Sequence, residues 1–584
     1  MIAAGLRARA GREVVSRIAR LGELAGTPIA VHQGGGWALG IAEPGLRMPD
    51  GSAWIGAGGP PDTVNAELRG PFAFLAIDGN SLLAGRGRLG GHPLYYARDE
   101  DGAILGCSRL QPLVELLGRP SCLEPARIGE LLTMDQGSSL TLYQGIRRAE
   151  SGQLVRVSPD GEDAKPLAPW RSRIAPSQDP AEVAEQLHHL INDSVSRSIG
   201  AARRVSVLVG GLDSSALLAS AIAEARGASA REVRAITWHF AGPGDDRPYV
   251  KDLCRSLDID PVRIQPADCA KHLLRPTAID ANPIVFPQSS WLLGTGRWAK
   301  SQGIDLLLSG AGGDTLLDGD FSVFADDLLH GHPIRGVRDA LRLRGVPYLA
   351  SPRARLATLV VRPLVERLFP RFRRAVRGLR ARRRLDGDFR WAGPALRHAI
   401  ERLLCRDVRP ATSPDGNNWF LEMREWFHQL GIASGCRFAE PYLDDELVAF
   451  LGAVPRRTLL YGGFRRGLLR FAYRDRLPDS VRLREGKSGF GHALAEVFTA
   501  AGGERLIAPY ASMTHLADLG FIEPRAFRAK FDRLVRDPTE PRQWVTTWPV
   551  LAMEAFLCEH TGAKANARRA VSSETTLHPP VDRT

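Results

Sequence analysis

The chain has 584 residues, of which 44% are hydrophobic and 24% charged, with 60 glycines and 40 prolines. This composition excludes a collagen, a coiled coil or a largely disordered polymer, and the length predicts more than one domain. The most apolar stretch, residues 357–369, is broken by charged residues, and the arginine-rich N-terminus lacks the apolar core of a secretory signal. We therefore expect a cytoplasmic protein with no membrane partner.

The formal net charge is +12, from 77 basic and 65 acidic side chains. Lysine contributes only seven of the basic residues, a skew toward arginine that coding bias explains as readily as a basic binding surface. Neither zinc-finger spacing nor the aromatic signature of an RNA-recognition motif accompanies the charge. We expect no nucleic-acid partner.

The cysteines and histidines indicate no disulfide framework and no metal. The seven cysteines include no CxxC pair, which predicts buried, reduced thiols. The 14 histidines show no HExxH or comparable spacing, so no structural metal is expected.

The predicted elements change character along the chain. Residues 28–165 contain short apolar runs separated by turn signals, which predicts an antiparallel β domain, and residues 165–180 read as a linker. From about residue 180, helical stretches alternate with buried strands, which predicts parallel βαβ units. The chain is then mainly helical from residue 320 to about 560, and residues 561–584 are predicted to be a disordered tail. The predicted parallel strands lie at 205–209, 232–240 and 304–308.

A two-glycine turn, residues 210–215 (GGLDSS), follows the first of these strands and opens a helical run. Glycines let backbone N–H groups approach a phosphate closely, and a helix N-terminus adds partial positive charge. The motif is neither the GxxxxGK[ST] loop nor the dinucleotide GxGxxG pattern. On its own it also fits an ordinary strand–turn–helix joint.

A second glycine-rich turn, residues 309–314 (SGAGGD), follows the strand at 304–308. Ligands of open α/β sheets bind at the carboxyl ends of the strands, where both turns are expected. Asp213 and Asp314 would then come from adjacent loops, and two carboxylates suit a Mg²⁺ ion that bridges nucleotide phosphates.

The two turns resemble the N-type ATP pyrophosphatase motif SGGLDSS and the SGxGGDE loop of the asparagine synthetase family. Residues 437–450, 466–490 and 544–556 resemble that family's later motifs, and residues 68–96 resemble the class II glutamine amidotransferase pattern. The resemblance covers about residues 28–560. It implies an α/β protein in which an Ntn-type αββα domain (1–165), similar to a glutamine amidotransferase, precedes a parallel-sheet adenine nucleotide α-hydrolase-like (PP-loop) domain (180–560) with a helical extension.

The same resemblance assigns roles to individual residues. Lys487 falls on the lysine that these enzymes use during amide formation, where an ammonium stabilises charge on the acyl-adenylate and tetrahedral intermediate. A lone lysine is otherwise a solvated charge, but its retention in a chain so rich in arginine favours the functional role. The expected cofactors are ATP and Mg²⁺, with Asp213 and Asp314 as metal ligands. The expected nucleotide-binding residues are Leu208, Gly210, Gly211, Asp213, Ser214, Ser215, Trp238, Ser309, Gly310, Gly312 and Gly313.

Departures from the family pattern narrow the expected function. Family members that hydrolyse glutamine use an N-terminal cysteine as nucleophile, whereas this chain has Ile2 and its first cysteine is Cys107. Glutamine is therefore not the expected nitrogen source. Loss of that cysteine is typical of β-lactam, carbapenam and lasso-peptide macrolactam synthetases. Ala311 stands where β-lactam synthetases have a tyrosine, which weighs against that class.

Other departures concern the acceptor pocket and the nucleotide loops. Arg437 and Ala439 replace a glutamate and an arginine of asparagine synthetases, which weighs against aspartate as substrate. Val209 replaces the first serine of SGGLDSS, and Thr315 replaces the glutamate of GGDE, so one phosphate contact and one outer carboxylate are missing.

These features favour a lasso-peptide macrolactam synthetase. It would adenylate an Asp or Glu side chain of a precursor peptide and join it to the peptide's N-terminal amine, with a leader-removing cysteine protease as partner. The alternatives are a ligase acting on a small molecule, such as a β-lactam-type cyclase, or a non-catalytic peptide-binding relative. The arginine-rich segment 335–384 is either a solvated basic face or a docking surface for an acidic partner.

Overall fold

The computed structural model describes most of the chain. Lys487, much of the arginine-rich segment after Phe369 and the predicted tail 561–584 lie outside the described residues. Within the described ranges, no helix has both the length and the apolar character that crossing a bilayer requires. The described residues are 1–6, 11–34, 37–41, 46–47, 53–56, 70–119, 122–133, 139–167, 172–227, 231–240, 242, 245–346, 349–369, 378–379, 382–383, 385–387, 389–405, 418–486 and 489–560.

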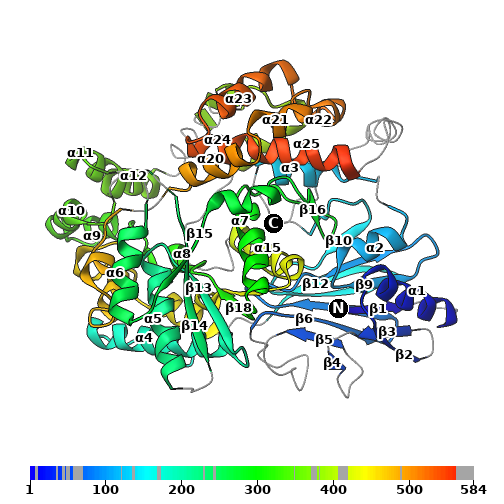
Figure 1. Ribbon diagram of the computed structural model, residues 1–584, viewed down its shortest axis with the longest axis horizontal. Helices are drawn as coiled ribbons and strands as arrows, with labels where there is room; N and C mark the ends of the chain where they lie inside the picture. The colour runs from blue at the N-terminus through cyan, green and yellow to red at the C-terminus, as the bar shows by residue number, and fades with distance from the viewer. Residues whose placement is uncertain are drawn as a thin grey trace.

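The N-terminal part contains two six-stranded antiparallel sheets that pack against each other (Figure 1). The first sheet has the order β10 (Ile146–Arg148), β8 (Tyr95–Arg98), β9 (Ile104–Cys107), β1 (Ile2–Leu6), β3 (Trp37–Ile41) and β2 (Ala30–Gly34). The second has the order β12 (Gly161–Pro166), β11 (Gln153–Ser158), β7 (Ser81–Arg86), β6 (Phe72–Asp78), β5 (Ala53–Gly56) and β4 (Leu46–Arg47).

Strand β1 shows how alternation builds these layers. Ile2, Ala4 and Leu6 point into the core between the two sheets. Ala3 and Gly5 face α1 (Gly11–Leu24) on the outside of the sheet. A Cβ atom at Gly5 would lie 2.8 Å from Val14 Cγ1, so only glycine lets the helix pack this closely. Helices α2 (Leu110–Leu116) and α3 (Pro125–Thr133) complete this part of the molecule.

A five-stranded parallel sheet forms the centre of the second part. Its order is β15 (Pro261–Ile264), β14 (Glu232–Trp238), β13 (Arg204–Leu208), β18 (Leu306–Leu308) and β19 (Arg437–Ala439). The edge strand β19 lies in a region predicted to be mainly helical, and its three residues are too short to show a strand pattern. The α/β fold class predicted from the sequence is confirmed.

Helices cover both faces of this sheet. Val205, Val207 and Leu306 face one side, where α4 (Pro180–Ile199), α5 (Leu212–Arg226) and α6 (Arg247–Leu257) pack. Ile236 and Leu307 face the other, against α7 (Ser289–Ser301) and α15 (Asn418–Ser434). Strand order reverses between β14 and β18 on either side of β13, which makes the carboxyl end of β13 the switch point where such sheets bind ligands.

Two further groups of helices lie outside the sheets (Figure 1). The C-terminal group packs beside α3 of the N-terminal part. It comprises α20 (Gly491–Ala500), α21 (Glu504–Ile507), α22 (Thr514–Asp518), α23 (Pro524–Arg536), α24 (Pro541–Thr546) and α25 (Trp548–His560). The other group, α9 (Val323–Leu329), α10 (Pro333–Arg342), α11 (Pro352–Arg355) and α12 (Arg362–Leu368), has a small core of its own.

The described residues of the arginine-rich segment between Arg335 and Phe369 lie in this second group. Arg335 pairs with Asp327 at 2.6 Å, and Arg362 pairs with Glu366 at 2.9 Å. Arg338, Arg344 and Arg367 also pair with carboxylates, so part of the charge of the described residues is neutralised locally. A docking role for the segment stays a prediction.

The cysteines differ in part from expectation. Cys107, Cys254, Cys269 and Cys436 are buried, but Cys122 and Cys558 are exposed, so the prediction of buried thiols was wrong for these two.

Cys558 lies 3.5 Å from His515 Nδ1, beside Glu554. These three residues form the one His/Cys/acidic cluster with metal-like spacing among the described residues. Glu554 accepts N–H bonds from His515 and Leu516 and so caps α22, which gives the carboxylate a structural role.

Candidate functional site

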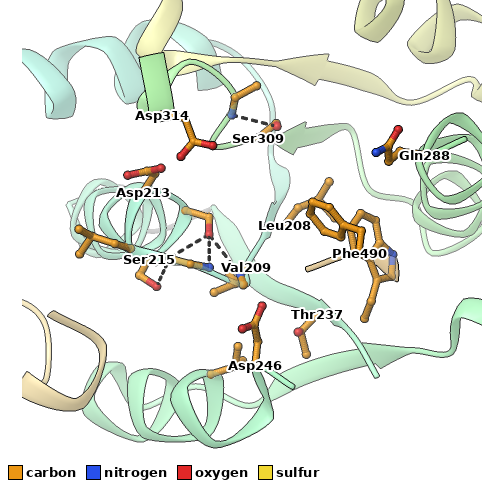
Figure 2. Close-up of a pocket in the computed structure, with 18 of the residues that line it drawn as sticks. Leu208, Val209, Asp213, Ser215, Thr237, Asp246, Gln288, Ser309, Asp314 and Phe490 are labelled. Atoms are coloured by element: carbon orange, nitrogen blue, oxygen red, sulfur yellow. Dashed lines mark hydrogen bonds between the residues drawn. The ribbon is translucent and has the colours of Figure 1, made fainter. Parts of the chain in front are cut away.

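The two predicted glycine turns meet at the carboxyl edge of the parallel sheet. A Cβ atom at Gly313 would lie 2.6 Å from Asp213 Cγ, and one at Gly310 would lie 3.1 Å from Ser214 N. Gly312 has a φ of 102°, a backbone conformation that favours glycine. The glycines therefore allow the two loops to touch, and this contact brings Asp213 and Asp314 together (Figure 2).

The first loop forms a small cradle of N–H groups. The backbone N–H groups of Gly210 and Gly211 donate to Ser214 Oγ at 3.1 and 3.2 Å. Ser215 Oγ donates to the Gly211 carbonyl at 2.8 Å. Two backbone donors thus converge on the Ser214 hydroxyl oxygen at the start of α5, the kind of position that an anionic phosphate oxygen takes when it replaces such a hydroxyl.

Arg466 binds both predicted metal ligands. It donates to Asp213 Oδ2 at 2.7 Å, to Asp318 Oδ1 at 2.6 Å and to Asp314 Oδ1. Burial disfavours its charged form, but the three carboxylates outweigh that effect and raise the pKa of Arg466 above its ordinary value. The site is therefore built to hold positive charge between the two loops.

The donor set at this point fits Mg²⁺. Asp213 and Asp314 both pair with the Arg466 guanidinium, so both carboxylates lie next to one centre of positive charge. Carboxylate oxygens are the hard ligands that Mg²⁺ prefers. The Asp213 side chain is 11% exposed and that of Asp314 is 46% exposed, so one ligand is fixed and the other remains open to solvent. The buried Tyr442 hydroxyl donates to the Asp213 carbonyl at 3.0 Å and helps to fix the first loop.

A cavity of about 460 Å³ opens above these loops. Trp238 lines it at the end of β14, held by a hydrogen bond from its Nε1 to Thr295 Oγ1 at 3.0 Å. Asp246 and Arg484, paired at 2.7 Å, lie beside Gly210, and the Arg484 guanidinium stacks 3.9 Å above the Tyr249 ring. This side of the cavity offers a flat aromatic surface next to charged groups.

The opposite wall of the cavity is apolar. Helix α15 contributes Met423, Trp426, Phe427 and Leu430 to it. Phe286, ahead of α7, packs edge-on against Trp426 with ring centroids 5.4 Å apart. The cavity therefore has an ionic end at the glycine loops and an aromatic end at α15.

Most of the predicted site residues line this one cavity. Gly312 and Gly313 do not line it but lie behind the second loop, where they pack against Tyr442 and Asp213. Lys487 lies outside the described residues; Gly486 and Phe490, on either side of it in the chain, line the cavity. The residues that line it are Leu208, Gly210, Gly211, Asp213, Ser214, Ser215, Trp238, Ser309, Gly310 and Asp314.

The N-terminus lies in the first sheet, away from these loops. Met1 is only 7% exposed, and Ile2 N donates to Ser108 Oγ at 3.0 Å between the neighbouring strands. Burial raises the pKa of the adjacent Cys107 thiol to about 12, which makes it a poor nucleophile. The N-terminal residues thus provide no reactive thiol.

Two elements of the cavity were missed in the sequence. Arg466 begins the stretch 466–490 that resembles a later family motif, but the sequence assigns it no role of its own. The α15 wall has an apolar residue at positions 423, 426, 427 and 430, the i, i+3, i+4, i+7 spacing of a helix face. That spacing was a usable signal for a buried helix in this region.

Two family models match the chain. The asparagine synthase model matches residues 186–558, and the glutamine amidotransferase domain model matches residues 54–168. Putative glutamine-hydrolysing asparagine synthetases from Mycobacterium bovis and from two strains of Mycobacterium tuberculosis are 24% identical over 513 residues, covering 79% of this chain and 73% of theirs.

The solved structures that were matched are more distant. The allosteric regulatory enzyme of purine biosynthesis and the Bacillus subtilis glutamine phosphoribosylpyrophosphate amidotransferase share 10% and 11% identity with the chain, with TM-scores of 0.19 and 0.20. They cover 45% of this chain and 80% and 81% of their own, and such scores support no argument about its fold or function. The family model alone spans well over half of the sequence, together with both glycine loops and the cavity. The chain belongs to the asparagine synthase family, whose domain implies the use of ATP.

Proposed function

We propose that the protein is an ATP-dependent, AMP-forming amide ligase that closes a macrolactam in a precursor peptide, as lasso-peptide synthetases do. The observation that carries the proposal is the meeting of two glycine loops, where an N–H cradle lies beside two carboxylates, Asp213 and Asp314, that both pair with Arg466. This combination suits the triphosphate of ATP at the switch point of the sheet.

The proposed reaction has two steps. A carboxylate oxygen of the peptide attacks the α-phosphorus, the bond between the α-phosphorus and its bridging oxygen breaks, and pyrophosphate leaves. The peptide's amine then attacks the acyl-adenylate carbonyl, the carbonyl–oxygen bond breaks, and AMP leaves with that oxygen while the amine gives up a proton to solvent. The products are one amide, AMP and pyrophosphate.

The chain's own residues would divide this work. The N–H groups of Gly210 and Gly211 would hold a phosphate oxygen, and Asp213 and Asp314 would hold Mg²⁺. The metal would neutralise charge on the phosphates when bound. By resemblance to the family, Lys487 would stabilise charge on the acyl-adenylate and on the tetrahedral intermediate.

The nitrogen is proposed to come from the substrate. Residue 2 is isoleucine, and the buried Cys107 thiol has a raised pKa, so a glutaminase nucleophile is lacking among the described N-terminal residues. A leader-removing cysteine protease is the proposed partner, because a peptide amine must be freed before ring closure. Purified protein is expected to release no glutamate from glutamine during turnover.

Two alternatives differ in chemistry. A small-molecule ligase, such as a β-lactam-type cyclase, would also adenylate a carboxylate, but Ala311 in the second loop supplies no tyrosine hydroxyl as a base. A non-catalytic peptide-binding relative would bind peptide without any exchange of pyrophosphate into ATP. Exchange of pyrophosphate into ATP would therefore distinguish either kind of ligase, which should show it, from a peptide-binding protein, which should not.

The proposal is tested with linear peptides that carry a free N-terminal amine and one Asp or Glu at successive internal positions. With Mg·ATP, the expected product is a peptide lighter by one water, together with stoichiometric AMP and pyrophosphate. The same peptides acetylated at the N-terminus are the matched control, which should support pyrophosphate exchange but give no ring. Cyclisation that produced ADP, or no exchange with any carboxylate, would refute the proposal.

A further inference from the structure

Helix α15 has two faces with different neighbours. One face carries Met423, Trp426, Phe427 and Leu430, which form the aromatic end of the cavity. The other carries Glu422 and Glu425, which point toward the N-terminal part of the chain. The helix lies between the N-terminal sheets and the parallel sheet (Figure 1). Its position therefore depends on both halves of the molecule.

A buried network of charges holds the second face. Glu425 accepts from Arg86 at 3.0 Å, and Glu422 accepts from Arg127 at 3.1 Å and from Arg148 at 2.8 Å. Burial alone would raise the pKa of Glu425, but Arg86 and Arg148 hold it below its ordinary value. Arg86 is only 1% exposed. Ion pairs this well buried fix the helix in one position and so make its cavity face a pre-formed wall.

If ATP binds at the glycine-loop end of the cavity, the α15 wall at the other end is left for the peptide substrate. Leu208 and Trp238, at the ends of β13 and β14, lie on the side where the proposed nucleotide base would rest. The second loop follows β18, which lies between β13 and β19 in the sheet, and α15 packs against β19. A carboxylate that attacks the α-phosphate would then carry its attached group toward α15.

The arginines that line the cavity pair with carboxylates or backbone carbonyls that do not belong to α15. Arg466 binds Asp213, Arg484 binds Asp246, and Arg470 donates to the backbone carbonyl of Arg484 at 2.9 Å. These arginines come from residues 465–484 and have partners outside α15. The wall itself offers aromatic and aliphatic side chains, which desolvate an apolar group without cost but leave a charged one unpaired.

We propose that the α15 wall is the acceptor subsite and that it selects a carboxylate flanked by an aromatic or large aliphatic group. In a peptide substrate, this is an Asp or Glu next to a residue such as Phe or Leu. The inference rests on the proposed ligase function and names the substrate class of the same cavity. Edge-on aromatic contact with Trp426 would favour Phe over an aliphatic neighbour of similar size.

The test uses pyrophosphate exchange into ATP with N-acetylated tripeptide amides in which Asp is flanked by Phe, Leu, Ser or Lys. We expect kcat/KM for the Phe and Leu peptides to exceed that for the Ser and Lys peptides by about 10- to 100-fold, the range of hydrophobic pocket selectivity. Trp426→Ala should remove most of this preference while the KM for ATP stays within a few-fold.

A variant that gains a new preference cannot be explained by unfolding, whereas a loss of activity can. Met423 is partly exposed on the wall, so Met423→Lys should improve exchange with a peptide in which Glu flanks the Asp. Ile432→Lys, on the same helix but 46% exposed and outside the cavity, is the matched control and should change nothing. Equal rates for all neighbours, or an unchanged preference in Met423→Lys, would overturn the inference. No exchange with any peptide would instead refute the proposed function.

Discussion

Removing the guanidinium of Arg466 should destabilise the protein, mainly because the buried Asp213 carboxylate loses its ion pair. Arg466 pairs with Asp213, Asp314 and Asp318. Asp318 keeps a second pair with Arg465, and Asp314 is 46% exposed, where solvent screens its charge. The Asp213 side chain is only 11% exposed, so without Arg466 its charge would stay buried but lose this ion pair.

The magnitude follows from this difference in burial. Breaking a buried ion pair by removing one partner costs about 3–5 kcal/mol, whereas an exposed pair contributes about 0–1 kcal/mol. We therefore expect Arg466→Met to lower the free energy of unfolding by about 3 kcal/mol. In double-mutant cycles, Arg466 should couple to Asp213 by about 2 kcal/mol and to Asp314 by less than about 1 kcal/mol.

The assay is urea unfolding of wild type, Arg466→Met, Asp213→Asn, Asp314→Asn and the two double variants, with and without Mg²⁺. A divalent cation can replace the lost positive charge, so Mg²⁺ should stabilise Arg466→Met more than wild type. Arg457→Met is the matched control, because Arg457 pairs with Asp327 and Asp339 away from the cavity. It should lose stability without gaining a response to Mg²⁺.

Two results would refute this reasoning. A coupling energy to Asp213 below about 0.5 kcal/mol would mean that the buried pair contributes little. An equal response of Arg466→Met and Arg457→Met to Mg²⁺ would mean that the two loops do not form a cation site.

Three further outcomes are expected. Asp314→Asn should lower pyrophosphate exchange by about 10²-fold, because a charge that stabilises the transition state is lost, while the fold is retained. Lys487→Ala, and Lys487→Arg almost as much, should suppress ring closure in single turnover but leave ATP affinity within a few-fold, since a guanidinium cannot replace a compact ammonium. Burial lowers the pKa of His428 to about 4, so its folded state binds fewer protons than the unfolded state, and stability should fall as pH drops from about 6.5 to 4. In thermal unfolding, His428→Gln should lose less stability than wild type over this pH range. Equal losses in the two proteins would mean that His428 does not cause the pH dependence.

The local parts of the fold and site could be predicted from sequence. Strands β13 and β18 are short and mostly apolar, and a glycine turn follows each of them closely, so strand and loop appear together in a short window. The parallel arrangement then follows from the alternation of strands and helices. Asp213 and Asp314 were predicted to lie together for this reason, and the loop contact brings them together.

Contacts between distant segments could not be predicted in this way. Arg466 meets Asp213 across 253 residues, and Arg148 meets Glu422 across 274, with no local pattern that links the partners. The same holds for β19, whose three residues join the sheet only because Phe438 fills a place against α7 and α15. The role of Lys487 stays a prediction.

Transfer of carboxylate oxygen to AMP would demonstrate that a peptide carboxylate is adenylated in this cavity, as we propose. A peptide whose Asp or Glu carboxylate carries ¹⁸O is incubated with Mg·ATP and the protein, and AMP and pyrophosphate are analysed by mass spectrometry. We expect one ¹⁸O atom in AMP for each ring formed, none in pyrophosphate, and no transfer by Asp213→Asn. Label in inorganic phosphate with formation of ADP, or ring closure without transfer of label, would contradict this proposal.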